Sequence, residues 1–191
     1  MKILITGFQP FGGQSVNPAW ETVKKLPDVL GDKVLWKLEI PVTFGGAFDA
    51  VEAKAAEIDP DVILCVGQAG GRDAVTPERI AVNLQDASIP DNAGNQPVDL
   101  PVVADGANAY FTTLPVKAMA AAVRAQGLPC RLSCTAGTYV CNDVFYRLLH
   151  RYRDTEKRVG FVHVPFLPEQ GSPNWPLESI VRALQAMLEA I

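Results

Sequence analysis

The sequence predicts an α/β protein: a single three-layer domain in which a mixed sheet is covered by helices on both faces. Short apolar runs rich in β-branched residues alternate with longer segments of helical period along the whole chain of 191 residues. No internal repeat or low-complexity linker interrupts this alternation. The length suits one domain, so residues 1–191 are expected to fold as one unit.

The first elements follow directly from local patterns. Lys2–Phe8 (KILITGF) is predicted to be a buried strand that ends in the loop QPFGG. Asn17 followed by Pro18 is typical of an N-cap and first helical position, so a helix is expected from there to Leu26. Val34–Val42 is the next predicted strand.

A second helix is predicted to begin at Thr43, as its N-cap, and to end before the dipeptide Asp59-Pro60. Asp61–Val66 (DVILCV) then has the continuous apolar character of a buried strand. The helix has an apolar face suited to packing on a sheet, formed by Phe44, Ala47, Phe48, Val51, Ala55 and Ile58.

The second half of the chain continues the pattern around one long loop. Glu78–Leu84 is a further strand candidate, and Asp86–Ala107 is rich in Pro, Asn, Asp and Gly without strong periodicity. We expect an ordered loop there, since such long loops often act as lids or binding loops. The remaining predicted elements are helices over Thr113–Gln126, Tyr139–Arg153 and Leu177–Ile191, and strands over Arg131–Cys134 and Val159–Val164.

Composition excludes several classes of function. A net charge of -4 leaves no basic stripe for a nucleic acid backbone, so no nucleic acid partner is expected. No run of 18 apolar residues predicts a membrane span, and the N-terminus lacks a secretory signal pattern, so we expect a cytoplasmic protein without a membrane partner. The four cysteines form no CxxC pair and are expected to be reduced thiols.

Cys141 in TAGTYVCND is the candidate nucleophile. It follows a predicted strand and a glycine turn and stands in the first turn of a predicted helix, where unpaired N–H groups carry partial positive charge. That position is expected to lower the pKa of the thiol and to supply donors for an oxyanion. The alternative is a small buried residue, which is the role expected of Cys65, Cys130 and Cys134.

Only one of the two histidines can act as a base for this thiol. His150 stands nine positions further along the same helix, roughly 13 Å away at about 1.5 Å per residue. His163 lies near the end of an apolar strand, where sites of α/β sheets collect, although a core histidine with satisfied nitrogens is the alternative. Glu78 would orient the imidazole or else lie exposed beside Arg79, and spacing alone does not pair it with His163.

Five stretches resemble the pyroglutamyl peptidase I family of cysteine peptidases, also called pyrrolidone carboxyl peptidases, which remove an N-terminal 5-oxoproline. The stretches are ITGFQPFGG with NPAWE, CVGQAGGR, TPERIAVNLQDASIPDNAGNQP, TAGTYVCNDVFY and FVHVPFLPEQ. They occur in order over most of the chain, and several are long and idiosyncratic. The resemblance implies a catalytic domain over residues 1–191, with Cys141 as nucleophile, His163 as base and Glu78 as the catalytic glutamate.

The resemblance also implies a substrate pocket and partners. Gln68 matches a residue whose backbone takes part in substrate or oxyanion binding. Peptides with N-terminal pyroglutamate are the implied substrates, a homo-oligomer, often a tetramer, is implied, and no metal or cofactor is expected. The segment SPNWPLE departs from the family pattern, so contacts of the C-terminal part do not carry over. The implied apolar slot for the oxoproline ring consists of Phe8, Phe11, Thr43, Ile89, Tyr139 and Val140.

Two other functions compete with this one. Another amidase of small amides would use the same Cys, His and Glu, although the chain lacks a G-x-C-x-G elbow. A small-molecule binder without catalytic activity would use the loops GFQPFGG and GQAGG for phosphate, but neither has a phosphate-binding glycine pattern.

Overall fold

The computed structural model describes all residues from 1 to 191 and has one six-stranded sheet with strand order β2-β3-β1-β4-β8-β5. The four central strands are parallel to one another, whereas the two edge strands are antiparallel to their neighbours. The predicted mixed sheet is therefore confirmed. The central strands are β1 (Lys2–Phe8), β3 (Lys33–Ile40), β4 (Val62–Gln68) and β8 (Arg158–Val164), and the edge strands are β2 (Val29–Leu30) and β5 (Thr76–Pro77).

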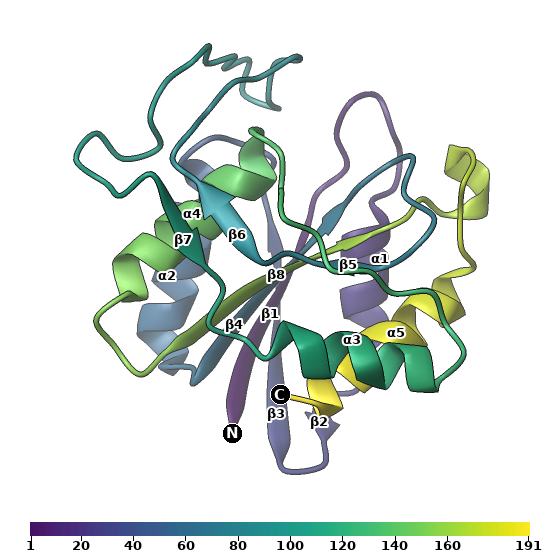
Figure 1. The fold of residues 1–191 in the computed structure, drawn as a ribbon. Helices are drawn as coiled ribbons and strands as arrows, with labels where there is room; N and C mark the ends of the chain where they lie inside the picture. The colour runs from purple at the N-terminus through teal and green to yellow at the C-terminus, as the bar shows by residue number, and fades with distance from the viewer.

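Three helices cover one face of the sheet, which alternate strand residues such as Ile3 and Ile5 line. These helices lie together on the right of the sheet in Figure 1. The first begins as its sequence predicts, because Asn17 Oδ1 accepts a hydrogen bond from Ala19 N and Pro18 takes the first position. The three helices are α1 (Pro18–Lys25), α3 (Val116–Ala125) and α5 (Leu177–Glu189).

The other face is covered by α2 (Gly46–Ile58) and α4 (Val140–Tyr152), which completes the three layers (Figure 1). The strand residues that point to this side form a second buried cluster with the two helices, and the cluster includes Leu4, Cys65 and Phe161. Because parallel strands buried on both faces need apolar residues at nearly every position, the continuous apolar runs of the sequence are explained.

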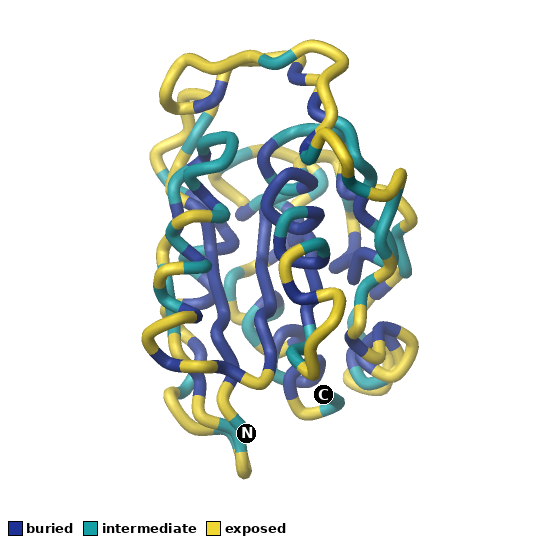
Figure 2. Tube along the Cα trace, turned by 90° about the vertical axis from the view of Figure 1, so that its left-hand side faces the viewer, coloured by how far each residue is buried: buried dark blue, intermediate teal, exposed yellow.

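A small second sheet packs against α4. It pairs β6 (Ile80–Val82) with β7 (Ala109–Phe111) in antiparallel register. The long connection between them contains the expected loop over residues 86–107, which has no helix or strand of its own. Figure 2 shows this loop as the mostly exposed segment at the top of the molecule, above the buried strands.

The carboxyl ends of the parallel strands share one edge, opposite the two chain termini (Figure 1). β4 ends there at Gln68 and β8 at Val164, and α4 starts at Val140 on the same side. A short 3-10 helix η1 (Pro168–Gln170) follows β8. This edge therefore gathers the segments that carry the candidate site. No helix combines the length and the apolar character needed to cross a bilayer.

Three local predictions are wrong. The strand expected over residues 78–84 is divided, because Glu78 N bonds to Phe161 O while Arg79 N turns to Ser133 O, and β6 then joins the small sheet. The strand expected over Arg131–Cys134 is reduced to one isolated bridge at Ser133, with a second at Cys130 just before it. Because this segment forms no strand, Cys134 is exposed rather than buried as predicted, whereas Cys65 and Cys130 are buried as expected.

The start of α2 also differs from the prediction. Its N-cap is Gly45, at φ 73°, and Thr43 contributes only a carbonyl oxygen that accepts from Ala47 N. Phe44 consequently precedes the helix instead of belonging to its apolar face. The positive φ explains the shift, because a glycine adopts this conformation without steric cost.

Candidate active site

Cys141 is the second residue of α4, and the residue after it anchors this helix end to β6. The amide of Asn142, which is fully buried, donates to Val82 O and Leu84 O at 2.8 and 3.0 Å and accepts from Val82 N at 2.9 Å. Every polar atom of the amide is thus used. These bonds fix the first helical turn and with it the backbone of the cysteine.

The thiol lies over the carboxyl ends of β4 and β8. Gly67 and His163 are partners in the register of these strands, so their side-chain positions share one face. A Cβ atom built at Gly67 would lie 2.9 Å from Cys141 Sγ and 2.8 Å from Phe161 Cζ. The missing side chain at Gly67 therefore provides the space that the sulfur occupies, next to the strand position of His163.

His163 and Glu78 form a buried pair. His163 Nδ1 lies 2.8 Å from Glu78 Oε1, and the two side chains are 5% and 0% exposed. A carboxylate accepts hydrogen bonds only, so Nδ1 carries the ring proton and Nε2 keeps its lone pair. The pairing that sequence spacing left open is thus present, and the glutamate is not exposed beside Arg79.

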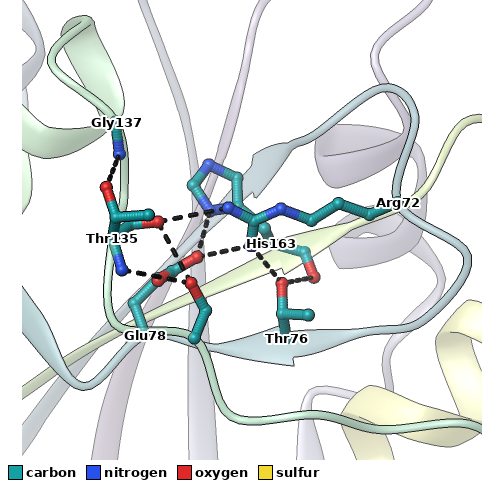
Figure 3. Close-up of polar contacts among 7 residues, drawn as sticks. Arg72, Thr76, Glu78, Thr135, Gly137 and His163 are labelled. Carbon is teal, nitrogen blue, oxygen red and sulfur yellow. Dashed lines mark hydrogen bonds and ion pairs between the residues drawn. The ribbon is translucent and has the colours of Figure 1, made fainter.

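Arg72 completes a polar cluster around the carboxylate (Figure 3). Its Nη1 lies 2.6 Å from Glu78 Oε1, the same oxygen that His163 contacts, and its Nη2 donates to Thr135 O at 3.2 Å. The other carboxylate oxygen, Oε2, has no hydrogen-bond partner. Ser133 does not serve it, because the Ser133 hydroxyl donates to Thr135 O at 3.1 Å.

The charges of this cluster follow from burial and ion pairing. Burial opposes ionisation of Glu78, but hydrogen bonds and charge from His163 and Arg72 outweigh it and lower the pKa of the carboxyl below its ordinary value. Burial lowers the pKa of His163, and Arg72 acts in the same direction against Glu78. The imidazole is therefore neutral at neutral pH, beside an ionised glutamate.

The expected low thiol pKa is wrong. Burial, with the charge of Glu78 adding to it, raises the pKa of Cys141 to about 12. Cys141 is partly buried, and the resulting desolvation of its thiol exceeds the effect of the helix N-terminus. The thiol and the imidazole are therefore both neutral at neutral pH, and a thiolate at Cys141 would form only by transfer of its proton to a base.

The residues of the implied ring slot divide into a buried and an accessible group. Phe8 and Val140 are at most 2% exposed and belong to the core cluster between the sheet, α2 and α4. Tyr139 lies between two other rings, with centroid distances of 6.2 Å to Phe11 and 5.4 Å to Phe44, the second edge-on. Thr43 is half-buried next to Gly46, and Ile89 is 43% exposed.

The loop that carries Ile89 is fastened to the segments around these rings. Asp91 Oδ2 accepts from Phe44 N at 2.9 Å, and Tyr139 donates its hydroxyl to Pro90 O at 3.0 Å. Asn92 donates its backbone N–H to Val42 O and its amide to Pro10 O. Although burial opposes it, bonding to backbone N–H groups and Asn95 lowers the pKa of Asp91, so the carboxylate stays charged and holds the loop.

Gln68 ends β4 beside the thiol. Its Oε1 accepts a hydrogen bond of 3.0 Å from Gln170 Nε2, which also donates to Val16 O. The side-chain oxygen of Gln68 is therefore bound to η1.

Sequence reasoning missed three contributors to the site. Arg72 stands directly after the glycine turn that ends β4, at the sheet edge where sites collect, and this placement is a usable signal. Asp91 stands in a Pro-Asp-Asn-Ala-Gly-Asn turn, where an aspartate commonly caps backbone N–H groups. The sequence predicts Phe44 on a helix face, and nothing local indicates its contact with Tyr139.

Comparisons with known proteins agree with the geometry. The family model described as pyroglutamyl peptidase matches residues 1–191. A pyrrolidone-carboxylate peptidase from Levilactobacillus brevis is 54% identical over 100% of this chain and 97% of its own length, and one from Enterococcus faecalis is 49% identical over 100% and 92%.

Solved structures extend the similarity to the fold. The crystal structure of pyroglutamyl peptidase I from Bacillus amyloliquefaciens has a TM-score of 0.96 at 41% identity and covers 99% of this chain and 93% of its own. The pyrrolidone carboxyl peptidase from Thermococcus litoralis has a TM-score of 0.95 at 36% identity, with 99% and 92% covered. The resemblance noted in the sequence is confirmed, and the chain belongs to the pyroglutamyl peptidase family of cysteine peptidases.

Proposed function

We propose that this chain is a cysteine exopeptidase that hydrolyses the amide bond after an N-terminal 5-oxoproline (pyroglutamyl) residue of a peptide. Cys141 is the nucleophile, His163 the base, and Glu78 the group that orients the imidazole. The observation that carries the proposal is the 2.8 Å contact between His163 Nδ1 and Glu78 Oε1, next to the strand position that the thiol covers. Family membership supports the same assignment.

The first half of the reaction makes a thioester. Sγ of Cys141 attacks the carbonyl carbon that joins the oxoproline to the next residue. Because the thiol is neutral at rest, its proton passes to His163 Nε2 during the attack. Glu78 stabilises the imidazolium that forms. The tetrahedral intermediate then collapses: the C–N bond breaks, and the leaving amine takes the proton from His163 Nε2.

The second half returns the enzyme to its starting state. Water loses a proton to His163 Nε2 as it attacks the thioester, the C–S bond breaks, and the sulfur recovers the proton. Free 5-oxoproline is released. In both halves the oxyanion is stabilised by backbone N–H groups at Cys141 and near Gln68, and one such donor is typically worth ~2.7–4 kcal/mol.

Substrate choice follows from the apolar surroundings. An oxoproline end is an uncharged lactam, so it needs a ring slot and a few amide partners. Phe8, Phe11, Thr43, Ile89, Tyr139 and Val140 supply the slot, the two fully buried residues as its packed base and the others as its walls. A prolyl end is rejected, because its ammonium would be buried without a counter-charge.

The proposal includes a setting for the enzyme. Four free cysteines, one of them the nucleophile, suit a reducing compartment such as the cytoplasm. We also propose self-association, up to the tetramer that the resemblance implies, and the exposed apolar side chains of Val98, Leu100 and Phe111 support it. Light scattering of the purified chain measures the assembly.

One assay tests the peptidase proposal. Release of fluorophore from an L-pyroglutamyl aminocoumarin amide is measured beside the L-prolyl amide and beside the Cys141→Ala variant, under reducing conditions. Cleavage of the first substrate alone, and only by the unchanged chain, supports both the thiol mechanism and the lactam slot. If well-folded protein cuts neither substrate, the proposal is wrong.

A further inference from the structure

We propose that Arg72 is a fourth member of this site, a positioning residue whose ion pair with Glu78 keeps His163 neutral and ready to accept the thiol proton. This inference rests on the proposed function for its catalytic meaning. The contacts that carry it are independent of any substrate.

The guanidinium and the imidazole share one carboxylate oxygen. Arg72 Nη1 and His163 Nδ1 lie 2.6 and 2.8 Å from Glu78 Oε1, and Figure 3 draws the three side chains converging on that atom. Thr76 Oγ1 and Thr135 O bind the same guanidinium, so its place is fixed from two further segments. Arg72 thus reaches the base through the glutamate and not through the substrate.

The fixed positive charge of Arg72 decides which group neutralises the carboxylate of Glu78. Glu78 is fully buried, and a buried carboxylate without a counter-charge is strongly disfavoured. Without Arg72, the nearest group able to supply a positive charge to Glu78 is the imidazole of His163. The imidazole would then bind a proton and lose its basic lone pair. An arginine does not lose its proton in proteins, so Arg72 balances Glu78 permanently and leaves His163 neutral.

No other charge faces the imidazole. The remaining titratable groups around the ring and the thiol are Cys141 itself, Cys65 on β4 and Tyr139. Burial raises the pKa of both thiols to about 12 and raises the pKa of Tyr139, so all three are neutral at neutral pH. β5 and the segment at Ser133 present hydroxyl and backbone groups only. Glu78 and Arg72 are therefore the two charges that set the protonation of His163, and they act in opposite directions.

Arg72 is also accessible from outside the site. Its side chain is 28% exposed and lines an open cavity of about 370 Å³, together with Thr76, Ser133 and Arg131. Replacement of the guanidinium thus opens the carboxylate to water without removing packing from the core. Arg131 on the same cavity wall makes an exposed ion pair with Asp73 and provides a matched control.

The test is a titration of the imidazoles by nuclear magnetic resonance, which is simple because the chain has only two histidines. The unchanged chain is compared with Arg72→Gln, Arg72→Lys and Arg131→Gln. We expect the His163 midpoint to move to higher pH in Arg72→Gln only, while His150 stays unchanged. In the same variant, the ratio of kcat/KM at pH 6 to that at pH 8 falls by roughly tenfold, since the base becomes protonated at the lower pH.

The titration separates this inference from the peptidase proposal because it needs no turnover. A folded Arg72→Gln variant whose His163 midpoint stays at the value of the unchanged chain overturns the role of Arg72, whatever the activity. A merely structural arginine predicts that result, with lower activity at every pH alike. Should Arg72→Gln fail to fold, Glu78→Gln is compared with the Glu78→Gln/Arg72→Gln double variant, which buries no unpaired charge. The midpoint must again rise on loss of the arginine, and an unchanged midpoint contradicts the inference.

Discussion

The Nδ1 atom of His163 and the Oε1 atom of Glu78 lie 2.8 Å apart, although 85 positions separate the two residues in the chain. β8 carries the histidine, and Glu78 follows β5, which pairs with β8 in antiparallel register. The backbone N–H of Glu78 continues this pairing by donating to Phe161 O. The sheet edge thereby holds the carboxylate against the imidazole before any substrate arrives, as general base catalysis requires.

The first prediction concerns the three proposed catalytic side chains. Cys141→Ser and His163→Ala should each abolish turnover, because the nucleophile or its base is lost, while circular dichroism remains that of the unchanged chain. Glu78→Gln should lose less activity than these two variants, since an orienting residue is usually less essential than a nucleophile. Initial rates on the pyroglutamyl aminocoumarin amide measure all three. Near-normal turnover by either of the first two variants would falsify the assignment.

The second prediction concerns Gly67, the strand residue whose missing side chain leaves space for the thiol of Cys141. Gly67→Ala places a methyl group 2.9 Å from Cys141 Sγ and 2.8 Å from Phe161 Cζ, so the sulfur must move and kcat should fall at least roughly tenfold. Overpacking of this kind typically costs about 1–3 kcal/mol of stability.

Gly160→Ala is the matched control for Gly67→Ala. Its new methyl group meets Leu114 on the opposite face of the sheet, so it should lower the melting temperature yet leave kcat intact. Equal kcat in both alanine variants would show that the thiol is not held at Gly67.

Much of the fold was predictable from local patterns. The buried strands β1, β4 and β8 are continuous apolar runs, and the Asn-Pro pair at positions 17 and 18 predicts where α1 begins. The strand predicted over residues 131–134 is absent because apolar character alone does not decide pairing, and a single isolated bridge, at Ser133, lies within this segment. Position in a sheet depends on partners that a single strand sequence does not name.

The site was predictable in its residue types and not in its charges. A helix-start cysteine and a strand-end histidine indicated the chemistry, whereas the pairing with Glu78 came from resemblance. The predicted low pKa of the Cys141 thiol is wrong because desolvation depends on tertiary packing, which the local sequence does not show. Likewise, the sequence does not show which acidic residue pairs with Arg72, and the ion pair with Glu78 becomes evident only in the folded structure.

The third prediction concerns the hydroxyl of Tyr139. Tyr139→Phe removes the bond to Pro90 O and loosens the loop beside Ile89, while the aromatic ring stays in place. A hydrogen bond of this kind is worth about 0.5–1.5 kcal/mol, so KM should rise by up to roughly tenfold with little change in kcat. Steady-state kinetics give the two constants separately. The control is Tyr110→Phe, which loses a bond to His150 away from the site, and a KM equal in both variants would contradict the role of the Tyr139 hydroxyl.

The fourth prediction is a stability maximum between about pH 6.5 and 9. The folded-state pKa values of His163 and Glu78 lie below their ordinary values of 6.5 and 4.5, so the unfolded chain binds protons first as the pH falls and the free energy of unfolding decreases. Cys65 and Cys141 keep their protons up to about pH 12 when folded, against 9.0 for a free thiol, so stability also decreases as the pH rises above 9.

Urea unfolding at a series of pH values measures this maximum. Between pH 9 and 10, below the ordinary range of tyrosine, the slope should be shallower in Cys65→Ala, because one of the three thiols with a raised pKa, Cys65, Cys130 and Cys141, is gone. A free energy of unfolding that keeps rising above pH 9 would rule out buried neutral thiols.

The last prediction is chemical rescue at Arg72. Arg72→Ala leaves Glu78 beside an open cavity, so an added guanidinium ion can enter and pair with the carboxylate where the side chain stood. At millimolar concentrations, well below those that unfold proteins, guanidinium should restore part of kcat/KM at pH 6. Urea has a similar planar shape without charge and should restore nothing, since the imidazole responds to the cation. Rescue by urea as well as by guanidinium would mean that Arg72 only fills space, and Arg131→Ala, as the control on the same wall, should respond to neither.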